Sequence, residues 1–197
     1  MDDFDDTELM LRYRDGDVRA FECLYRRHKT MLYRYLQRMC KQSGMADDVF
    51  QDVWSKVIAQ RDRYEVRAQF KTYLFTIARN AALDLIRRNS AARIDDWSDI
   101  EDHANQLADG SQSLDTQVAT LQLRHDVKQE LEKLPGAQRE AFVLFEEAEM
   151  DLHQIAVITG VSMETAKSRL RYAVSKLRSA LQQYHPAQSQ LSSGAMP

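Results

Sequence analysis

Apolar side chains recur along this chain at steps of three and four residues. Between residues 17 and 41 they form one unbroken row, namely Phe21, Leu24, Tyr25, His28, Leu32, Leu36 and Met39. A helix of about 3.6 residues per turn brings such positions onto one face. The 197 residues include only six glycines and three prolines, too few for the many turns of a β protein. The sequence therefore predicts an all-α fold.

The same spacing predicts further helices over about 7–14, 46–60, 69–89, 137–148 and 163–183. Asp17 is placed to cap the long helix, and Gly44 breaks the pattern after it. Residues 93–116 are acidic, polar and without strong periodicity, which is typical of a linker. We expect two small helical domains, 5–92 and 117–184, joined by an acidic flexible linker at 93–116 and followed by a disordered tail at 185–197.

Three features indicate a cytoplasmic protein. The N-terminus is acidic, whereas a secretory signal begins with basic residues and an apolar core. No apolar run reaches the roughly 20 residues that span a bilayer. The two cysteines, Cys23 and Cys40, fit neither a redox pair nor a zinc pattern, so we expect reduced, partly buried thiols.

The net charge of −3 hides two basic blocks. Residues 61–93 carry eight basic side chains against three acidic ones, and residues 161–181 carry five against one. Between them, residues 95–115 hold seven acidic side chains and no lysine or arginine. Clustered positive charge is the electrostatic mark of nucleic-acid binding, so the distribution favours a DNA-binding protein.

Residues 151–181 follow the pattern of a helix-turn-helix. Asp151 and Gln154 form a capping-box arrangement, Gly160 occupies a helix C-terminal position, and Ser162 begins the next helix. That helix turns a basic face outward, opposite Ala166, Leu170, Ala173, Leu177 and Leu181. Its N-terminal side chains are placed to reach base edges in a major groove. An ordinary solvated amphipathic helix is the alternative.

The first basic block has a different character. On the predicted helix 69–89, Thr76, Asn80, Asp84 and Arg87 form a polar stripe, and aromatic residues surround it. Basic groups mixed with aromatics suit single-stranded DNA, whose unpaired bases stack while its phosphates need counter-charge. An amide such as Asn80 can read the edge of an extruded base. A plain solvated face, with Phe70 in the core, remains the alternative.

Residues 46–54 place several carboxylates beside Trp54. Paired acids on a helix can hold Mg²⁺, but a helical enzyme needs a second acidic cluster around a deep cavity. Tryptophan is enriched where proteins dock, so this face is better explained as a docking surface, with a solvated face as the alternative.

The five histidines are scattered without metal-ligand spacing. We therefore expect no catalytic residues, no metal and no cofactor.

Taken in order, these stretches resemble a bacterial RNA polymerase sigma factor of the extracytoplasmic-function (ECF) group in the sigma-70 family. The resemblance covers about residues 7–183. Residues 17–28 resemble the opening of the sigma-2 domain, and residues 46–54 and 70–88 resemble its core-binding and promoter-melting regions. Leu134 and Pro135, followed by residues 155–170, resemble sigma-4.

The resemblance implies a role for each surface. It assigns binding of the polymerase β′ coiled coil to Asp48, Gln51, Asp52 and Trp54. It assigns the opened −10 element, with the loop 61–69 and Asn80 around a flipped base, to Tyr64, Arg67, Lys71, Tyr73, Thr76, Arg79, Asn80, Arg87 and Arg88. It assigns the −35 duplex to Ser162, Glu164, Thr165, Lys167, Ser168, Arg171, Tyr172 and Ser175. Family members often carry arginine at the positions of Tyr172 and Val174, so the −35 helix departs from the family pattern there.

The resemblance also implies partners. These are core RNA polymerase through its β′ and β subunits, promoter DNA in duplex and single-stranded form, and a separate anti-sigma protein that can hold the chain at the inner membrane. The acidic linker is implied to thread the polymerase channel, and no nucleotide hydrolysis is needed. Two rivals stay open: a stand-alone helix-turn-helix regulator, and a metal-dependent enzyme using Asp47, Asp48 and Asp52.

Overall fold

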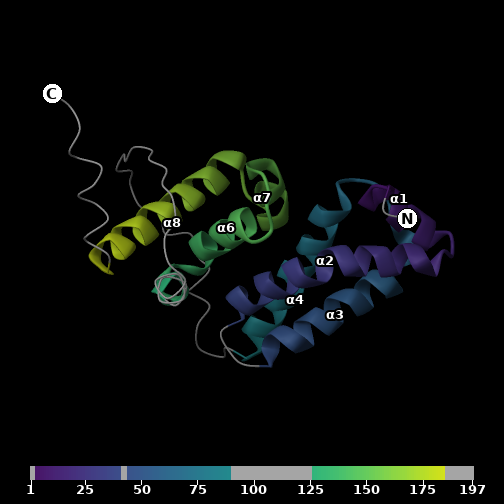
Figure 1. Cartoon of the computed structure of the whole chain (residues 1–197), viewed down its shortest axis with the longest axis horizontal. Helices are drawn as coiled ribbons and strands as arrows, with labels where there is room; N and C mark the ends of the chain where they lie inside the picture. Colours follow the sequence, from purple (N-terminus) through teal and green to yellow (C-terminus); the bar gives the residue numbers. More distant parts are fainter. Residues whose placement is uncertain (1–2, 41–43, 90–125, 185–197) are drawn as a thin grey trace.

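The computed structural model describes residues 3–40, 44–89 and 126–184, and all regular secondary structure in these ranges is helical (Figure 1). This confirms the all-α prediction. The predicted linker at 93–116, the expected start of the second domain at 117 and the tail at 185–197 lie outside the described residues. The elements are α1 (Asp6–Arg14), α2 (Val18–Met39), α3 (Met45–Ala59), the short 3-10 helix η1 (Arg61–Arg63), α4 (Phe70–Asn89), α6 (Gly136–Glu146), α7 (Leu152–Thr159) and α8 (Met163–Tyr184).

A further helical segment runs over residues 126–133. None of the helices in the described ranges is long and apolar enough to cross a membrane.

Helix ends follow local sequence signals closely. The Asp17 side chain accepts a hydrogen bond from the Arg19 amide at 3.1 Å and caps α2. Gly160 ends α7 with a φ of 71°, in the left-handed region that side chains other than glycine rarely adopt. The Ser162 hydroxyl accepts from the Thr165 amide at 3.1 Å. These three predictions are confirmed. Each depends on only a few neighbouring residues, so the sequence alone was enough to make it.

The capping box at the start of α7 is complete. The Asp151 carboxylate accepts from the Gln154 amide at 2.8 Å, and the Gln154 side chain accepts from the Asp151 amide at 3.0 Å. We expect Asp151→Ala to lower the free energy of unfolding by about 1 kcal/mol, because an amide of the first turn loses its acceptor. Urea unfolding measures the loss. His153→Ala, an exposed change in the same turn, should cost nothing, and an equal loss there would contradict the assignment.

The first half, α1 to α4, encloses a core of aliphatic and aromatic side chains. Leu24, Leu32 and Leu36 of α2 are fully buried, as are Phe70 and Leu74 of α4. Val49, Val53 and Val57 form one row along α3 and are buried as well. Cys23 and Cys40 are both buried thiols outside any disulfide, and burial raises the pKa of the Cys40 thiol to about 11. The apolar row predicted between residues 17 and 41 thus contains the inner face of α2.

An ionic cluster fastens α1 to α2. The Arg27 guanidinium donates to Asp6 at 2.8 Å, and the His28 Nε2 lies 2.6 Å from the other Asp6 oxygen. Burial pushes the pKa of Asp6 upward, but the hydrogen bonds from His28 and Arg27 outweigh it, so this pKa is below its ordinary value. No local pattern predicts that Asp6 meets His28, since 22 residues separate them.

The second half is the helix-turn-helix with its supporting helices. Ala166, Ala173 and Leu177 form the buried side of α8, and the last two share a small cluster with Leu131 and Leu134. Phe142 packs against both cores. Phe145 is 42% exposed although its neighbours Leu144 and Ala148 are fully buried, so it lies on the outer side of this segment.

The two halves pack directly on each other. Helix α6 contacts α2, and α7 contacts α4 (Figure 1). Buried side chains of α6 and α7, including Leu144 and Ile155, belong to the same apolar core as those of α2 and α4. The sequence predicted two domains on a linker, and it did not predict that they would share a core.

Candidate nucleic-acid interface

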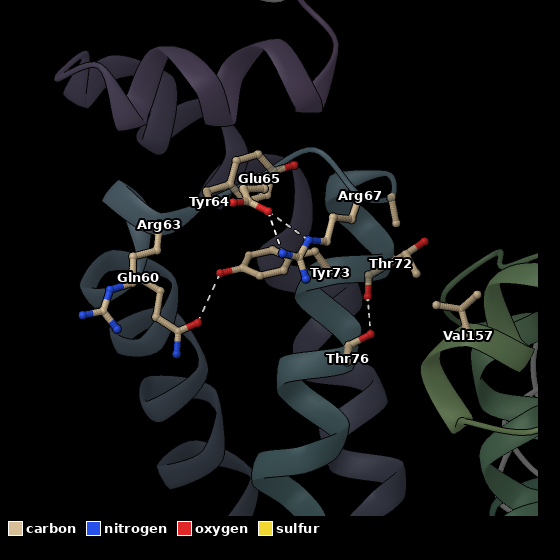
Figure 2. Close-up of a pocket in the computed structure, with 10 residues that line it drawn as sticks. Gln60, Arg63, Tyr64, Glu65, Arg67, Thr72, Tyr73, Thr76 and Val157 are labelled. Atoms are coloured by element: carbon tan, nitrogen blue, oxygen red, sulfur yellow. Dashed lines mark hydrogen bonds and ion pairs between the residues drawn. The ribbon is translucent and has the colours of Figure 1, made fainter.

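A hollow of about 510 Å³ opens where the segment after α3 meets the start of α4 (Figure 2). It lies within the first basic block. Its lining combines aromatic, amide, hydroxyl and basic side chains with one residue from the second half: Gln60, Arg63, Tyr64, Glu65, Arg67, Ala68, Thr72, Tyr73, Thr76 and Val157. The predicted −10 residues Tyr64, Arg67, Tyr73 and Thr76 are thus brought together in one hollow.

Two tyrosines form one wall of this hollow. The Tyr64 and Tyr73 rings meet edge to face, with centroids 5.2 Å apart and planes at 69°. Tyr73 is half-buried, and its hydroxyl donates to Gln60 at 3.5 Å. Tyr64 is only 4% exposed, so its ring can support Tyr73 but has little surface for a base. The structure thus places Tyr64 behind Tyr73, and a direct contact of Tyr64 with DNA stays a prediction.

Burial shapes the ionisation of this wall. It raises the pKa of Tyr73 and, with smaller contributions from Tyr73, Asp5 and Asp6, that of Tyr64. Both phenols therefore stay neutral at physiological pH. A neutral aromatic face next to basic groups suits an unpaired base beside its phosphates.

The remaining side chains of the hollow are polar and mostly open. The Thr76 hydroxyl donates to the Thr72 carbonyl at 2.8 Å, which leaves its oxygen as an acceptor. Arg67 is exposed and pairs with Glu65 at 2.6 Å. Lys71 lies half-buried beside the hollow, and burial lowers its pKa against the opposing influence of Glu149 and Asp6.

Helix α4 carries the polar stripe that the sequence predicted. Asn80, Arg87 and Arg88 are exposed along it. Arg79 is different, because its Nε donates to both carboxylate oxygens of Glu140 at 3.0 and 3.1 Å, and its side chain is only 19% exposed. In this arrangement Arg79 is not available to a DNA phosphate, contrary to the expectation.

The outer face of α8 is open to solvent. None of the predicted −35 residues is buried: Ser162, Glu164, Thr165, Lys167, Ser168, Arg171, Tyr172 and Ser175. The Ser162 and Thr165 hydroxyls lie 2.9 Å apart and complete the N-terminal cap. The Arg171 guanidinium lies 5.5 Å from the centre of the Tyr172 ring, a cation–π contact.

The acidic face of α3 adjoins the C-terminal part of the α4 stripe. Asp48, Gln51 and Asp52 are exposed, and Asp52 pairs with Lys56 at 2.7 Å. A smaller hollow of about 330 Å³ lies between this face and α4, next to Asp84 and Arg88. In the described parts of the chain, no group of three or more His, Cys, Asp or Glu side chains is placed to hold a metal ion.

Trp54 itself is buried. Its side chain is only 5% exposed and packs edge-on against Phe21 at 5.7 Å and Tyr25 at 5.0 Å. A ring in this position presents almost no surface to a partner, so the structure lends no support to a direct contact by Trp54, which stays a prediction. Trp54 instead fixes the face on which Asp48 and Asp52 stand.

Several contacts at this interface could not be predicted from the sequence. Gln154 of α7 donates to Gln69, just before α4, at 2.8 Å, and Val157 of α7 faces the tyrosine-walled hollow (Figure 2). Glu140 meets Arg79 across 61 residues of sequence. Only a correlated pattern between distant positions could have found these pairs.

Comparisons with known proteins identify the family of this chain. The family model for sigma-70 region 2 matches residues 24–92, and the model for sigma-70 region 4 matches residues 124–177. The chain is 33% identical to the RNA polymerase sigma factor CarQ of Myxococcus xanthus, over 87% of this chain and 95% of that protein. It is 30% identical to the ECF sigma factor SigM of Mycobacterium tuberculosis, over 87% and 82% of the two chains.

Two solved structures also match this chain over most of its length. The structure of CnrH in complex with the cytosolic domain of CnrY matches with a TM-score of 0.66 and 26% identity, covering 89% of this chain and 96% of that one. The sigma factor RpoE of Bartonella quintana, in complex with the anti-sigma factor NepR, matches with a TM-score of 0.63 and 28% identity, covering 82% and 96%. On these grounds the chain belongs to the ECF group of sigma-70 RNA polymerase sigma factors, the proteins that give core polymerase its promoter specificity.

Proposed function

We propose that this sigma factor divides its work among three surfaces. The exposed part of α3, Asp48, Gln51 and Asp52, binds core polymerase. The hollow and stripe of α4 hold the opened −10 strand, and the outer face of α8 reads the −35 duplex. The unit 5–92 contains the first two surfaces and the unit 117–184 the third, joined by the acidic linker at 93–116. The protein acts in the cytoplasm and catalyses no covalent step.

One observation supports this division above the others. A tyrosine-walled hollow lies at the N-terminal end of the stripe that carries Asn80, Arg87 and Arg88. Tyr73 offers a ring for stacking, the Asn80 amide offers both donor and acceptor, and the arginines offer charge for phosphates. Capturing an unpaired base in this way provides free energy for strand opening, so nucleotide hydrolysis is unnecessary.

The exposed basic face of α8 complements this site. Lys167 and Arg171 carry positive charge toward solvent beside the shorter Glu164 and Ser168. In a helix-turn-helix the second helix enters the major groove, where basic groups contact phosphates and shorter polar groups contact base edges. Duplex and opened DNA would thus be recognised by different helices.

Solved relatives suggest how this activity is controlled. RpoE of Bartonella quintana was solved with an anti-sigma factor, and CnrH with the cytosolic domain of CnrY. We infer that a separate anti-sigma protein binds this chain too. Such a partner, if anchored in a membrane, would hold the sigma factor at the inner membrane.

Run-off transcription with core polymerase on fragmented genomic DNA tests the proposed function. The expected result is a discrete set of transcripts that appear only when the protein is added. Duplex binding without any promoter-dependent transcript would favour a stand-alone regulator. Turnover of a substrate that requires Mg²⁺ would favour the enzyme alternative.

Asn80→Ala should weaken open-complex formation by about 2- to 12-fold, the loss of one hydrogen bond to an unpaired base. Binding to −35 duplex should be unchanged, because Asn80 lies on α4 and not on α8. Permanganate footprinting measures opening on a promoter found by run-off, and a mobility shift measures duplex binding. Lys167→Ala is the matched control. It should weaken binding to −35 duplex and leave strand opening unchanged. Equal losses in both assays for Asn80→Ala would contradict its role.

A further inference from the structure

The contact between the two halves contains a charged group with no access to water. Glu140 of α6 is 0% exposed. One carboxylate oxygen accepts from the Tyr35 hydroxyl of α2 at 3.1 Å, and both accept from Arg79 of α4 at 3.0 and 3.1 Å. A single side chain of the second half is thus held by two helices of the first half.

This contact is unlike an ordinary surface ion pair. Burial raises the pKa of Glu140, while Arg79, Tyr35 and Arg169 favour its ionised form. A buried carboxylate that loses its partner is strongly unfavourable, so Glu140 stays inside only while Arg79 is present. If the halves separate, water can solvate Glu140, and Arg79 becomes free to pair elsewhere. The contact therefore has two stable outcomes, both partners joined or both solvated.

Arg79 lies on the helix that carries the DNA-facing stripe, immediately before the exposed Asn80. A guanidinium binds a carboxylate and a phosphate by the same forked hydrogen-bond geometry. Glu140 therefore occupies the binding capacity that a strand phosphate would use. The same guanidinium cannot serve both partners at once.

Helix α7 reinforces the closure at the hollow. Gln154 donates to Gln69 at 2.8 Å, and Val157 forms part of the lining (Figure 2). A weaker pair, Arg38 with Glu147 at 3.5 Å, joins α2 to the end of α6. The outer face of α8 remains exposed. Closure thus restricts the surface for opened DNA and leaves the surface for duplex DNA accessible.

We propose that Glu140, Arg79 and Tyr35 form a latch by which the free protein inhibits itself, and that a strand phosphate competes with Glu140 for Arg79. The proposal rests on the DNA-holding role given to α4 above. In the closed form the chain has low affinity for single-stranded DNA. In the open form Arg79 becomes available beside the tyrosine-walled hollow, which then loses only Val157 from its lining.

The test compares the whole wild-type chain with Glu140→Gln, which keeps the shape of the side chain and removes its charge. Small-angle X-ray scattering measures the radius of gyration, and fluorescence anisotropy with a twelve-nucleotide oligothymidine measures binding at fixed salt. If the wild type is open a tenth of the time, a fully open variant binds about tenfold more tightly. We expect Glu140→Gln to have a larger radius of gyration and at least fivefold tighter binding.

Two further variants complete the comparison. Tyr35→Phe removes one hydrogen bond and keeps the buried ring, so we expect a smaller change in the same direction. Glu146→Gln makes the same chemical change at an exposed position of α6 and should match the wild type in both measurements. A loss of helical circular dichroism in Glu140→Gln would mean that this variant is unfolded. The radius of gyration and oligothymidine binding of Tyr35→Phe then decide whether the latch exists.

The latch is overturned if the latch variants stay as compact as the wild type, or if they open without binding the oligonucleotide more tightly. Neither result affects run-off transcription by the wild type, which tests the proposed function separately. A failure of run-off together with opening of Glu140→Gln would instead remove the DNA role and leave only a structural contact.

Discussion

Replacing Trp54 by alanine should lower the free energy of unfolding by about 3–5 kcal/mol, the range observed when a buried aromatic is truncated. The ring is only 5% exposed and contacts Phe21, Tyr25 and Phe50 edge-on, so its removal leaves a cavity that these neighbours cannot fill without moving. Urea unfolding followed by circular dichroism measures the change.

Ile58→Ala is the matched control for Trp54→Ala. Ile58 lies one turn further along α3 and is 45% exposed, so its truncation should cost well under half as much. If Trp54→Ala kept full stability and lost only polymerase binding, Trp54 would be an interface residue after all. The two variants thus separate a packing role from a docking role on the same helix.

Asp48→Arg should weaken binding to core polymerase by at least about 30-fold, the effect of losing one interface hot spot. Asp48 is exposed in the first turn of α3, where reversing its charge costs at most about 1 kcal/mol of helix stability. The loss would therefore come from the interface and not from unfolding. Anisotropy of a labelled chain titrated with the core enzyme of its own host measures the affinity.

Glu146→Arg provides the control for this charge reversal. Glu146 is exposed on α6, away from the acidic face of α3. Replacing it by arginine changes the net charge of the chain by the same amount as Asp48→Arg. It should leave polymerase affinity within about twofold of the wild type. Equal weakening by both variants would show a general electrostatic effect and would count against a specific docking surface on α3.

The sequence was a reliable guide wherever a structural decision is local. Apolar spacing predicted which face of α2 is buried, and Asp17, Asp151 and Gly160 marked helix ends. Each of these outcomes depends on residues within about one helical turn. The helix-turn-helix was predicted for the same reason, since its caps and its turn glycine are adjacent in sequence.

Sequence reasoning failed where two distant segments decide the outcome together. Trp54 belongs to a row of α3 that could have been exposed, and only Phe21 and Tyr25 of α2 settle its burial. Arg79 has the same local surroundings as a DNA-binding arginine, yet Glu140, far along the chain, determines its partner. Local patterns specify which helical face is polar but not which polar group it meets.

Family resemblance predicted the fold class and the function, but it did not specify the arrangement of the two halves. It assigned roles to the surface of each half as if the halves were independent. The packing of α7 on α4 makes one of these surfaces dependent on the other half. The site residues on α4 are therefore correctly grouped by sequence, while their availability follows from tertiary packing.

The shared core also sets an order of events during synthesis. Helix α4 ends at residue 89 and α6 ends at residue 146, so the ribosome must add the intervening chain before α6 can cover α2. At the usual rate of about 5–20 residues per second, this takes on the order of 3–11 seconds. Throughout that interval Arg79 lacks Glu140, and the nascent first half presents its uncovered apolar surface and its DNA-facing helix to the cell.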